Sequence, residues 1–211
     1  MPKRISGVSK RLLKAAREEF LQKGYENASL RTIAAKAQTS PRAIYTRFAN
    51  KEDLFHGVVF PVYEDFIHLY EEERAAYWER GQNKDFSVDP ETIYIRYIEY
   101  AYRYREDFVL LLTCSGGTRY ENFTRQIAQR EIQGVYEHIP QLFDVDQGEA
   151  MRLFVEKITY AFYENLFSPV TEGMDLATAR EYVGMLTRFY DTGIAMGAAK
   201  NVLELRELNL H

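Results

Sequence analysis

The stretch from Ser29 to Lys51, SLRTIAAKAQTSPRAIYTRFANK, constrains the fold of this chain more than any other. It contains two short segments with apolar residues at helical spacing, joined by a polar corner that is too short for anything but a sharp turn. Ser40 can cap the second helix and Pro41 can occupy its first position, where a missing backbone donor costs nothing. Two such helices must pack on each other, which predicts a DNA-binding helix-turn-helix. The apolar positions are Ile33, Ala34 and Ala37, then Ile44 and Phe48.

The order of elements in this stretch resembles the TetR family of one-component bacterial repressors. The shared pattern is a helix, a turn, a second helix with an aromatic end, and a lysine that opens a long helix. The resemblance implies that Tyr45 and Lys51 contact phosphates and that Phe48 belongs to the core. It is specific for the N-terminal part of the chain; the remainder is similar only in the number and length of its helices.

Two positions depart from the family pattern. Gln38 stands where the family usually has glycine in the turn, so we expect a positive φ at a cost of about 1 kcal/mol. Thr46 replaces a common second aromatic residue and Arg47 a common histidine, so the operator sequence does not follow from the resemblance.

The predicted DNA-contacting residues lie on the side of the second helix that faces away from its apolar stripe, and around the turn. We expect Arg42 and Arg47 to contact base edges, and Tyr45, Lys51 and Ser29 to hold phosphates. The full predicted set is Ser29, Arg31, Thr39, Ser40, Pro41, Arg42, Ala43, Tyr45, Thr46, Arg47 and Lys51.

Charge divides the chain into a basic and an acidic part. Residues 1–51 contain 12 Lys or Arg against three Glu, a net charge of +9, whereas the rest carries −13 within a total of −4. A basic N-terminal module on an acidic body indicates DNA binding by the module alone. The alternative is a basic face that only contacts solvent. It is less favoured, because the positive charge coincides with the helix-turn-helix.

The sequence contains no apolar run long enough to span a bilayer and no apolar signal-peptide centre, so we expect a cytoplasmic protein without membrane contact. A single cysteine, Cys114, excludes an internal disulfide framework. The four histidines are too scattered for a helical metal site, and Cys114-Ser115-Gly116-Gly117 has no local base partner. We therefore predict no enzyme activity, metal or cofactor.

Helical periodicity predicts an all-α fold. Residues 1–50 form an N-terminal three-helix helix-turn-helix domain, and residues 51–211 form a C-terminal helical domain for ligand binding and dimerisation. Pro61 is expected to bend or break the long helix that Lys51 opens. The expected helices cover residues 9–23, the long helix with Asn50 as its N-cap, then 90–113 with Asp89 as its cap, 120–139 ended by Pro140, 147–167 started by a capping box of Asp146 and Glu149, and 176–196.

The chain contains 30 aromatic residues, of which 26 follow Lys51. They could form a tyrosine-rich core, or they could line a cavity for an inducer. Arg105 breaks an apolar stripe, so an anionic group of the ligand could meet it; an ion pair with Glu156 or Glu164, or a solvent-exposed guanidinium, would also explain it. The acidic body equally admits a cationic lipophile. The predicted ligand-binding residues are Phe66, Tyr70, Tyr94, Tyr97, Ala101, Arg105, Phe108, Phe123, Ile127, Tyr160 and Tyr163.

Continuous apolar stripes in the helices at 147–167 and 176–196 predict a four-helix interface in a homodimer. The expected partners are thus a second copy, a pseudo-palindromic double-stranded DNA operator and a small-molecule inducer. The alternatives are a DNA-binding protein without a ligand, and a helical enzyme or carrier with an accessory DNA-binding module.

Overall fold

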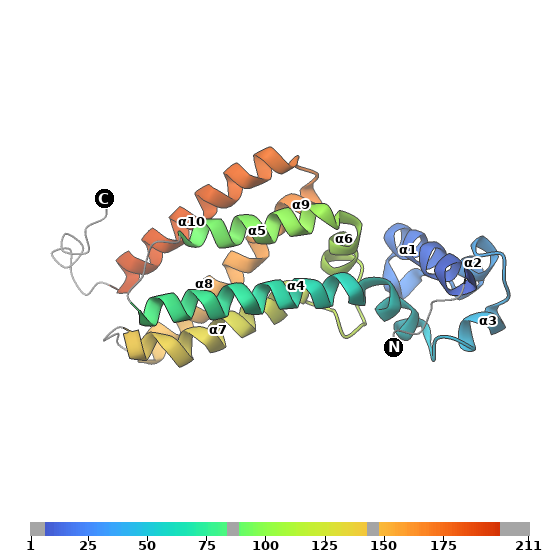
Figure 1. Ribbon diagram of the computed structural model, residues 1–211, viewed down its shortest axis with the longest axis horizontal. Coiled ribbons are helices and arrows are strands. Elements are labelled where there is room, and N and C mark those ends of the chain that lie inside the picture. Colours follow the sequence, from blue (N-terminus) through green and yellow to red (C-terminus); the bar gives the residue numbers. More distant parts are fainter. Residues whose placement is uncertain (1–6, 84–88, 143–147, 199–211) are drawn as a thin grey trace. The chain divides into compact units, whose positions relative to one another are not determined.

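The computed structural model describes residues 7–83, 89–142 and 148–198, which form ten helices and no strand (Figure 1). The all-α prediction is confirmed. The chain divides into two compact units: Met1–His68 with Arg103–Phe123, and Leu69–Tyr102 with Thr124–His211. No described helix has an apolar stretch of the length that a bilayer requires.

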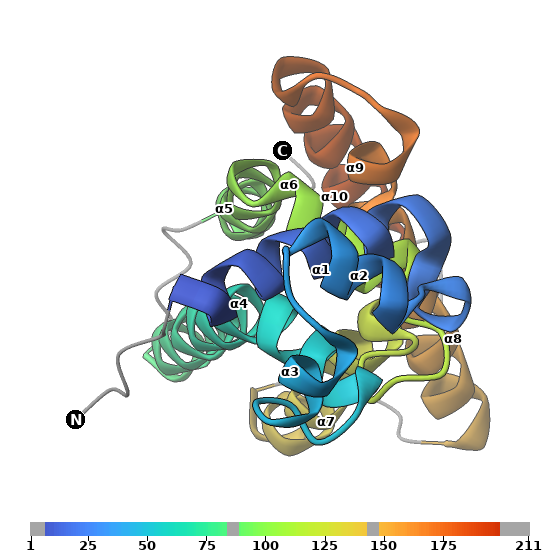
Figure 2. The same cartoon turned by 90° about the vertical axis from the view of Figure 1, so that its right-hand side faces the viewer.

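The first unit is built on three N-terminal helices, seen from another side in Figure 2. Helix α1 packs against α2 and α6, and α2 packs against α3. Gly24, with a φ of 71°, kinks α1 where the sequence predicted its end, and three more residues follow in helical form. The unit contains α1 (Gly7–Asn27), α2 (Leu30–Lys36), α3 (Pro41–Tyr45), the beginning of α4 (Lys51–Gln82) and α6 (Arg105–Thr113).

The start of α4 confirms Asn50 as its N-cap. The Asn50 Oδ1 accepts a hydrogen bond from the backbone N–H of Asp53 (2.8 Å), and the Asp53 carboxylate accepts one from the N–H of Ala49 (3.0 Å). Pro61 lies inside α4, which continues to Gln82, so a break at this residue is wrong. Proline removes one backbone hydrogen bond, and the burial of its neighbours on α4 offsets that loss.

The second unit contains the remaining helices and the end of α4. An ion pair between Arg130 and Glu71 (2.9 Å) joins α7 to α4, and one between Arg188 and Glu91 (2.6 Å) joins α10 to α5. Helix α8 packs against α10. The helices of this unit are α5 (Pro90–Arg103), α7 (Phe123–Leu142), α8 (Glu149–Leu166), α9 (Ser168–Glu172) and α10 (Leu176–Ala198).

The single helix expected over residues 90–113 is wrong, although Asp89 caps its start as predicted, with its Oδ1 accepting from the N–H of Glu91 (2.9 Å). Tyr104 leaves the helical region (φ −118°, ψ 44°), so α5 ends at Arg103 and α6 begins at Arg105. Because α6 packs against α1, tertiary contacts favour this change of direction over a continuous helix.

Three boundaries in the C-terminal half also differ from the predictions. Helix α7 begins at Phe123 and runs through Pro140 to Leu142, so Pro140 does not end it. Helix α8 has Gly148 as its N-cap, so the capping box predicted from Asp146 and Glu149 is wrong; Asp146 lies outside the described residues. Helix α9 was not predicted: Pro169 occupies its first turn and Gly173, with a φ of 81°, closes it.

Candidate nucleic-acid interface and ligand cavity

The turn between α2 and α3 has the geometry that the sequence predicts. The Ser29 hydroxyl accepts from the N–H of Thr32 (3.4 Å) and the Ser40 hydroxyl from that of Ala43 (3.3 Å), so each short helix has a capped start. Gln38 has a φ of 52°, which confirms the positive value expected at this position. A glycine would adopt this φ without strain, so the presence of Gln38 in the turn costs a small amount of folding free energy.

The residues predicted to read DNA form an exposed surface around α3. Ile44 is fully buried and anchors the helix, whereas Tyr45, on the next position, is 59% exposed. An aromatic side chain so exposed on a five-residue helix has no role in the core, and its hydroxyl can reach a phosphate. The exposed members of the predicted set are Arg31, Ser40, Pro41, Arg42, Tyr45, Thr46 and Arg47, and the partly buried ones are Ser29, Thr39, Ala43 and Lys51.

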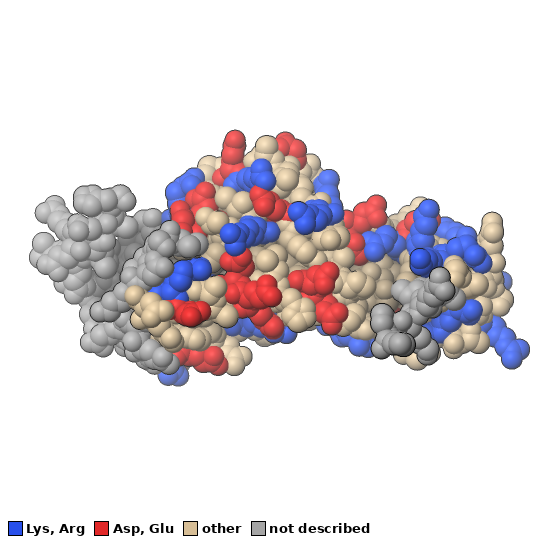
Figure 3. All heavy atoms as spheres, viewed as in Figure 1, with Lys and Arg blue, Asp and Glu red and all other residues tan. Residues whose placement is uncertain are grey.

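Basic side chains gather on this module. In Figure 3, lysine and arginine atoms are frequent over the first helices, whereas acidic and basic atoms alternate over the second unit. Arg47 lies in the turn after α3, and its guanidinium folds back on the end of that helix, where Nη1 donates to the carbonyl of Ala43 (2.9 Å) and the hydroxyl of Thr46 (2.9 Å). Both bonds are exposed, so exchanging them for bonds to a base edge costs little.

Lys51 has a second role that sequence reasoning missed. Its ammonium group donates to the carbonyls of Glu26 (2.9 Å), in the last turn of α1, and of Ala28 (3.3 Å), just after that helix, and lies 4.6 Å from the centre of the Tyr25 ring. A cation at a helix C-terminus is stabilising. The charge is therefore held in place next to Ser29, and one of its three N–H donors is left for a phosphate.

Glu19 braces α1 against α2. Its side chain is buried, and its carboxylate accepts from the Lys36 ammonium (3.0 Å) and from the backbone N–H of Ser29 (3.4 Å). Burial alone would raise the pKa of Glu19, but these two contacts hold the pKa below its ordinary value. A carboxyl whose pKa is lowered by folding stabilises the fold above its unfolded pKa, and that contribution is lost as the pH falls through the folded pKa.

We expect Glu19→Gln to lower the free energy of unfolding by about 1–2 kcal/mol at neutral pH, because a charge-assisted contact to Lys36 is lost. The difference from wild type should shrink below about pH 4.5, where the wild-type carboxyl also becomes neutral. Denaturant unfolding at a series of pH values measures it, with Glu18→Gln on the exposed side of α1 as the control. A difference that does not change with pH would exclude the ionised carboxylate as its source.

The core of the second unit contains a buried ion pair. Arg74 of α4 pairs with Glu131 of α7, and the hydroxyls of Tyr70 and Tyr163 both donate to Glu131 Oε2 at 3.1 Å. The exposed fractions of the Arg74 and Glu131 side chains are 11% and 9%. Burial and the charge of Glu131 raise the pKa of Tyr70, so its hydroxyl stays a donor. Four polar groups thus satisfy one another inside an aromatic core.

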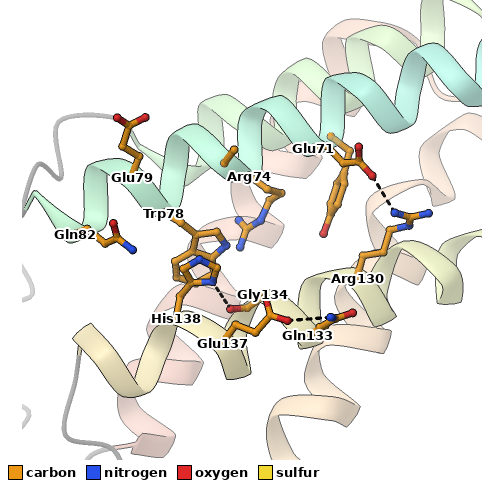
Figure 4. Close-up of a pocket in the computed structure, with 12 residues that line it drawn as sticks. Glu71, Arg74, Trp78, Glu79, Gln82, Arg130, Gln133, Gly134, Glu137 and His138 are labelled. Carbon is orange, nitrogen blue, oxygen red and sulfur yellow. Dashed lines mark hydrogen bonds and ion pairs between the residues drawn. The ribbon is translucent and has the colours of Figure 1, made fainter.

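A cavity of about 490 Å³ lies beside this ion pair, between α4 and α7 (Figure 4). Its volume is within the range of sites for small molecules. Trp78 stacks on His138 inside it, with ring centres 4.7 Å apart and planes inclined by 8°. The lining residues are Tyr70, Glu71, Arg74, Ala75, Trp78, Glu79, Gln82, Arg130, Gln133, Gly134, Glu137 and His138.

Of the predicted ligand-binding residues, Tyr70 lines this cavity. Tyr94, Tyr97, Ala101, Ile127, Tyr160 and Tyr163 lie elsewhere in the second unit, and Phe66, Arg105, Phe108 and Phe123 belong to the first. Several rings of the set pack on one another, as Tyr94 does on Tyr163 and Phe66 on Phe108. For these ten residues ligand contact stays a prediction.

Arg105 is a correction. The sequence placed it within an apolar stripe of one long helix, but it is the first residue of α6 and is exposed. An exposed guanidinium carries little burial cost, so the argument from a buried charge in an apolar stripe does not hold at this position. The arginine of the buried ion pair described above is Arg74, which follows Phe66 and Tyr70 and precedes Trp78 at intervals of four residues.

Comparisons with known proteins agree with this geometry. Residues 12–58 match the family model of bacterial regulatory proteins, tetR family. Among solved structures, a transcriptional regulator (TerR/AcrR family) from Aquifex aeolicus VF5 is similar, with a TM-score of 0.57, 21% identity, and coverage of 84% of this chain and 95% of that one. Among curated proteins, none matches the sequence.

Two further solved structures share the fold. A TetR-like transcriptional regulator from Rhodococcus sp. RHA1 has a TM-score of 0.52 and 16% identity, covering 89% of this chain and 96% of its own. NalD, the secondary repressor of the MexAB-OprM multidrug efflux pump in Pseudomonas aeruginosa, has a TM-score of 0.52 and 20% identity, covering 86% and 94%. The resemblance of the N-terminal part of the chain to the TetR family is confirmed by the match over residues 12–58, and the solved structures share the fold of the chain.

Proposed function

We propose that this protein is a transcriptional repressor of the TetR family, which binds a pseudo-palindromic operator as a homodimer and is released when a small molecule enters its second unit. The observation that carries the proposal is the exposed surface of α3 and the turn after it, where Arg42, Tyr45 and Arg47 are exposed next to the buried Ile44. We place the protein in the cytoplasm, because that is where a bacterial regulatory protein meets its DNA.

Direct readout in this proposal depends on two arginines. Arg42 and Arg47 contact base edges in the major groove, because a guanidinium can donate two hydrogen bonds to one guanine. Tyr45, Ser29 and Lys51 hold phosphates, which position the helix without reading sequence. Arg31, Thr39, Ser40, Pro41, Ala43 and Thr46 complete the surface that faces the DNA.

The homodimer is supported by exposed apolar side chains on α8 and α10. Leu153 on α8 is 54% exposed, and Met185 and Phe189 on α10 are 59% and 71% exposed. Large apolar groups at four-residue spacing on one helix mark a surface that a partner covers. The dimer contributes two copies of α3, which would meet successive major grooves about 34 Å apart. The apolar stripe predicted for the helix at 176–196 also includes Gly193 and Ile194, whose surroundings lie outside the described part of the chain.

The ligand part of the proposal is supported by the cavity between α4 and α7, which offers an aromatic surface and polar groups in a volume suited to a small molecule. Helix α4 continues from the first unit into the second, so a ligand that contacts α4 can bias the position of the DNA-reading helices. Such coupling between two sites is typically worth 1–3 kcal/mol.

The proposal is tested by mobility-shift titrations with DNA from upstream of the protein's own gene. We expect Arg47→Ala to relax the preference among operator variants by about 1–3 kcal/mol at one position, because a base contact is lost. Lys51→Ala should weaken binding to all sequences alike and flatten the slope of log affinity against log salt by about one unit.

Lys157→Ala on α8 removes one exposed positive charge far along the chain and serves as the control, with thermal unfolding to confirm that each variant is folded. Equal salt slopes for wild type and Lys51→Ala would remove the phosphate assignment of Lys51. Wild-type protein that prefers no upstream sequence over random DNA would contradict the repressor proposal.

A further inference from the structure

Trp78 provides an aromatic surface in the cavity between α4 and α7. Two other side chains of the protein lie against its indole ring. The His138 ring stacks on it almost in parallel, and the Arg74 guanidinium carbon lies 4.9 Å from its centre. One of these groups is a flat heteroaromatic ring and the other is a cation. The indole thus already accepts both a planar partner and a positive charge.

The charged residues that line the cavity include three glutamates, Glu71, Glu79 and Glu137, against two arginines, Arg74 and Arg130. Arg74 is paired with Glu131, and Arg130 with Glu71, so neither arginine supplies an uncompensated positive charge. Glu79 and Glu137 add two carboxylates to the lining. In Figure 4, Glu137 lies beside the stacked rings and its Oε1 accepts from Gln133 Nε2 (2.8 Å), whereas Glu79 points away from the cavity.

We propose that this cavity binds a planar aromatic cation, which replaces His138 on the face of Trp78 and has Glu137 as its counter-charge. A flat cation combines the two interactions that the indole makes within the chain, stacking and cation–π attraction. An anion would meet the excess of carboxylates described above and would gain no unpaired guanidinium. The inference names the ligand class of the proposed regulator and in that respect rests on the proposed function.

Gly134 leaves room for the indole beside α7, and His138 fills the space over the indole ring. A Cβ on Gly134 would lie 3.3 Å from Trp78 Nε1, so glycine lets the indole approach α7 closely. His138 Nδ1 donates to the carbonyl of Gly134 (2.8 Å), one helical turn back, which holds the imidazole over the indole. His138 therefore acts as an internal occupant that a ligand must displace.

Trp78 is the sole tryptophan of the chain, so its fluorescence reports on this cavity directly. Three bicyclic probes of nearly equal shape separate charge from stacking: N-methylquinolinium is a cation, quinoline is neutral at pH 8, and quinoline-2-carboxylate is an anion. We expect N-methylquinolinium to bind the full-length protein at roughly 0.1 mM, as its size allows, and about tenfold tighter than quinoline. Calorimetry provides the affinity independently of probe absorbance.

Variants test the assigned roles of Glu137 and His138. Glu137→Gln should weaken binding of the cation about fivefold without changing the binding of quinoline. Glu72 on α4 is exposed and lies outside the cavity lining, so Glu72→Gln is the matched control for the loss of one charge. His138→Ala should tighten all stacking probes by about two- to tenfold, because the internal competitor is gone. Trp78→Leu should abolish binding of the probes. Unfolding curves of His138→Ala show whether this variant keeps the fold of the site.

Each outcome decides the proposal. Quinoline or the carboxylate binding as tightly as the cation overturns the ligand class, and weaker binding to His138→Ala overturns the displacement of His138. Release of operator DNA is measured separately with the same probe. Binding of the cation without release of operator DNA would leave the cavity assignment intact and remove the inducer role. If the protein still binds and releases operator DNA but the cation does not bind at Trp78, this inference alone is overturned.

Discussion

Glu131→Leu is expected to lower the free energy of unfolding of the second unit by about 3–5 kcal/mol, the largest stability effect of any charge substitution described here. The substitution leaves the Arg74 guanidinium buried without its counter-ion and removes the shared acceptor of the Tyr70 and Tyr163 hydroxyls. Uncompensated buried charge is costly because water is no longer available to solvate it.

Unfolding in urea, followed through Trp78 fluorescence and through helical circular dichroism, measures this effect. The control is the double variant Arg74→Met, Glu131→Leu, which removes both charges and fills the space with apolar atoms of similar length. We expect it to recover most of the lost stability, because replacing a whole buried ion pair is often neutral. If the single variant loses less than about 1 kcal/mol, water reaches Arg74 and the pair is not part of the core.

The helix-turn-helix could be predicted because its signals are local. Ser40 and Pro41 define the start of α3, and Asn50 defines the start of α4, each within a few residues of the helix they begin. The positive φ of Gln38 follows from the sharp corner itself. Where start and stop signals lie next to the helix in sequence, periodicity and capping rules are sufficient.

The ligand region could not be predicted in the same way, because its contacts join residues far apart in sequence. Trp78 and His138 lie on different helices, as do Arg74 and Glu131, and neither pairing has a local signature. Arg105 was singled out from a helical wheel that assumed a continuous helix through Tyr104. The four-residue spacing of Phe66, Tyr70, Arg74 and Trp78 was the signal available for the buried arginine.

Phe189→Glu is expected to turn the proposed dimer into monomers at low micromolar concentration. Phe189 is 71% exposed in the single chain and lies one turn from Met185, so among the side chains that the structure describes it is the most accessible apolar group of the proposed interface. A carboxylate placed at the centre of an apolar contact must be desolvated twice in a symmetric dimer, once from each copy. Sedimentation or light scattering measures the change in mass.

Loss of the dimer should also reduce operator affinity by about 10²–10⁴, because the second half-site is then no longer bound from within the same complex. Ala177→Glu adds the same charge to an exposed position of α10 outside the apolar positions and should remain dimeric. A Phe189→Glu protein that stays dimeric would move the interface away from α10. A monomer with undiminished operator affinity would instead show that each chain reads its half-site alone, and the pseudo-palindrome would lose its physical basis.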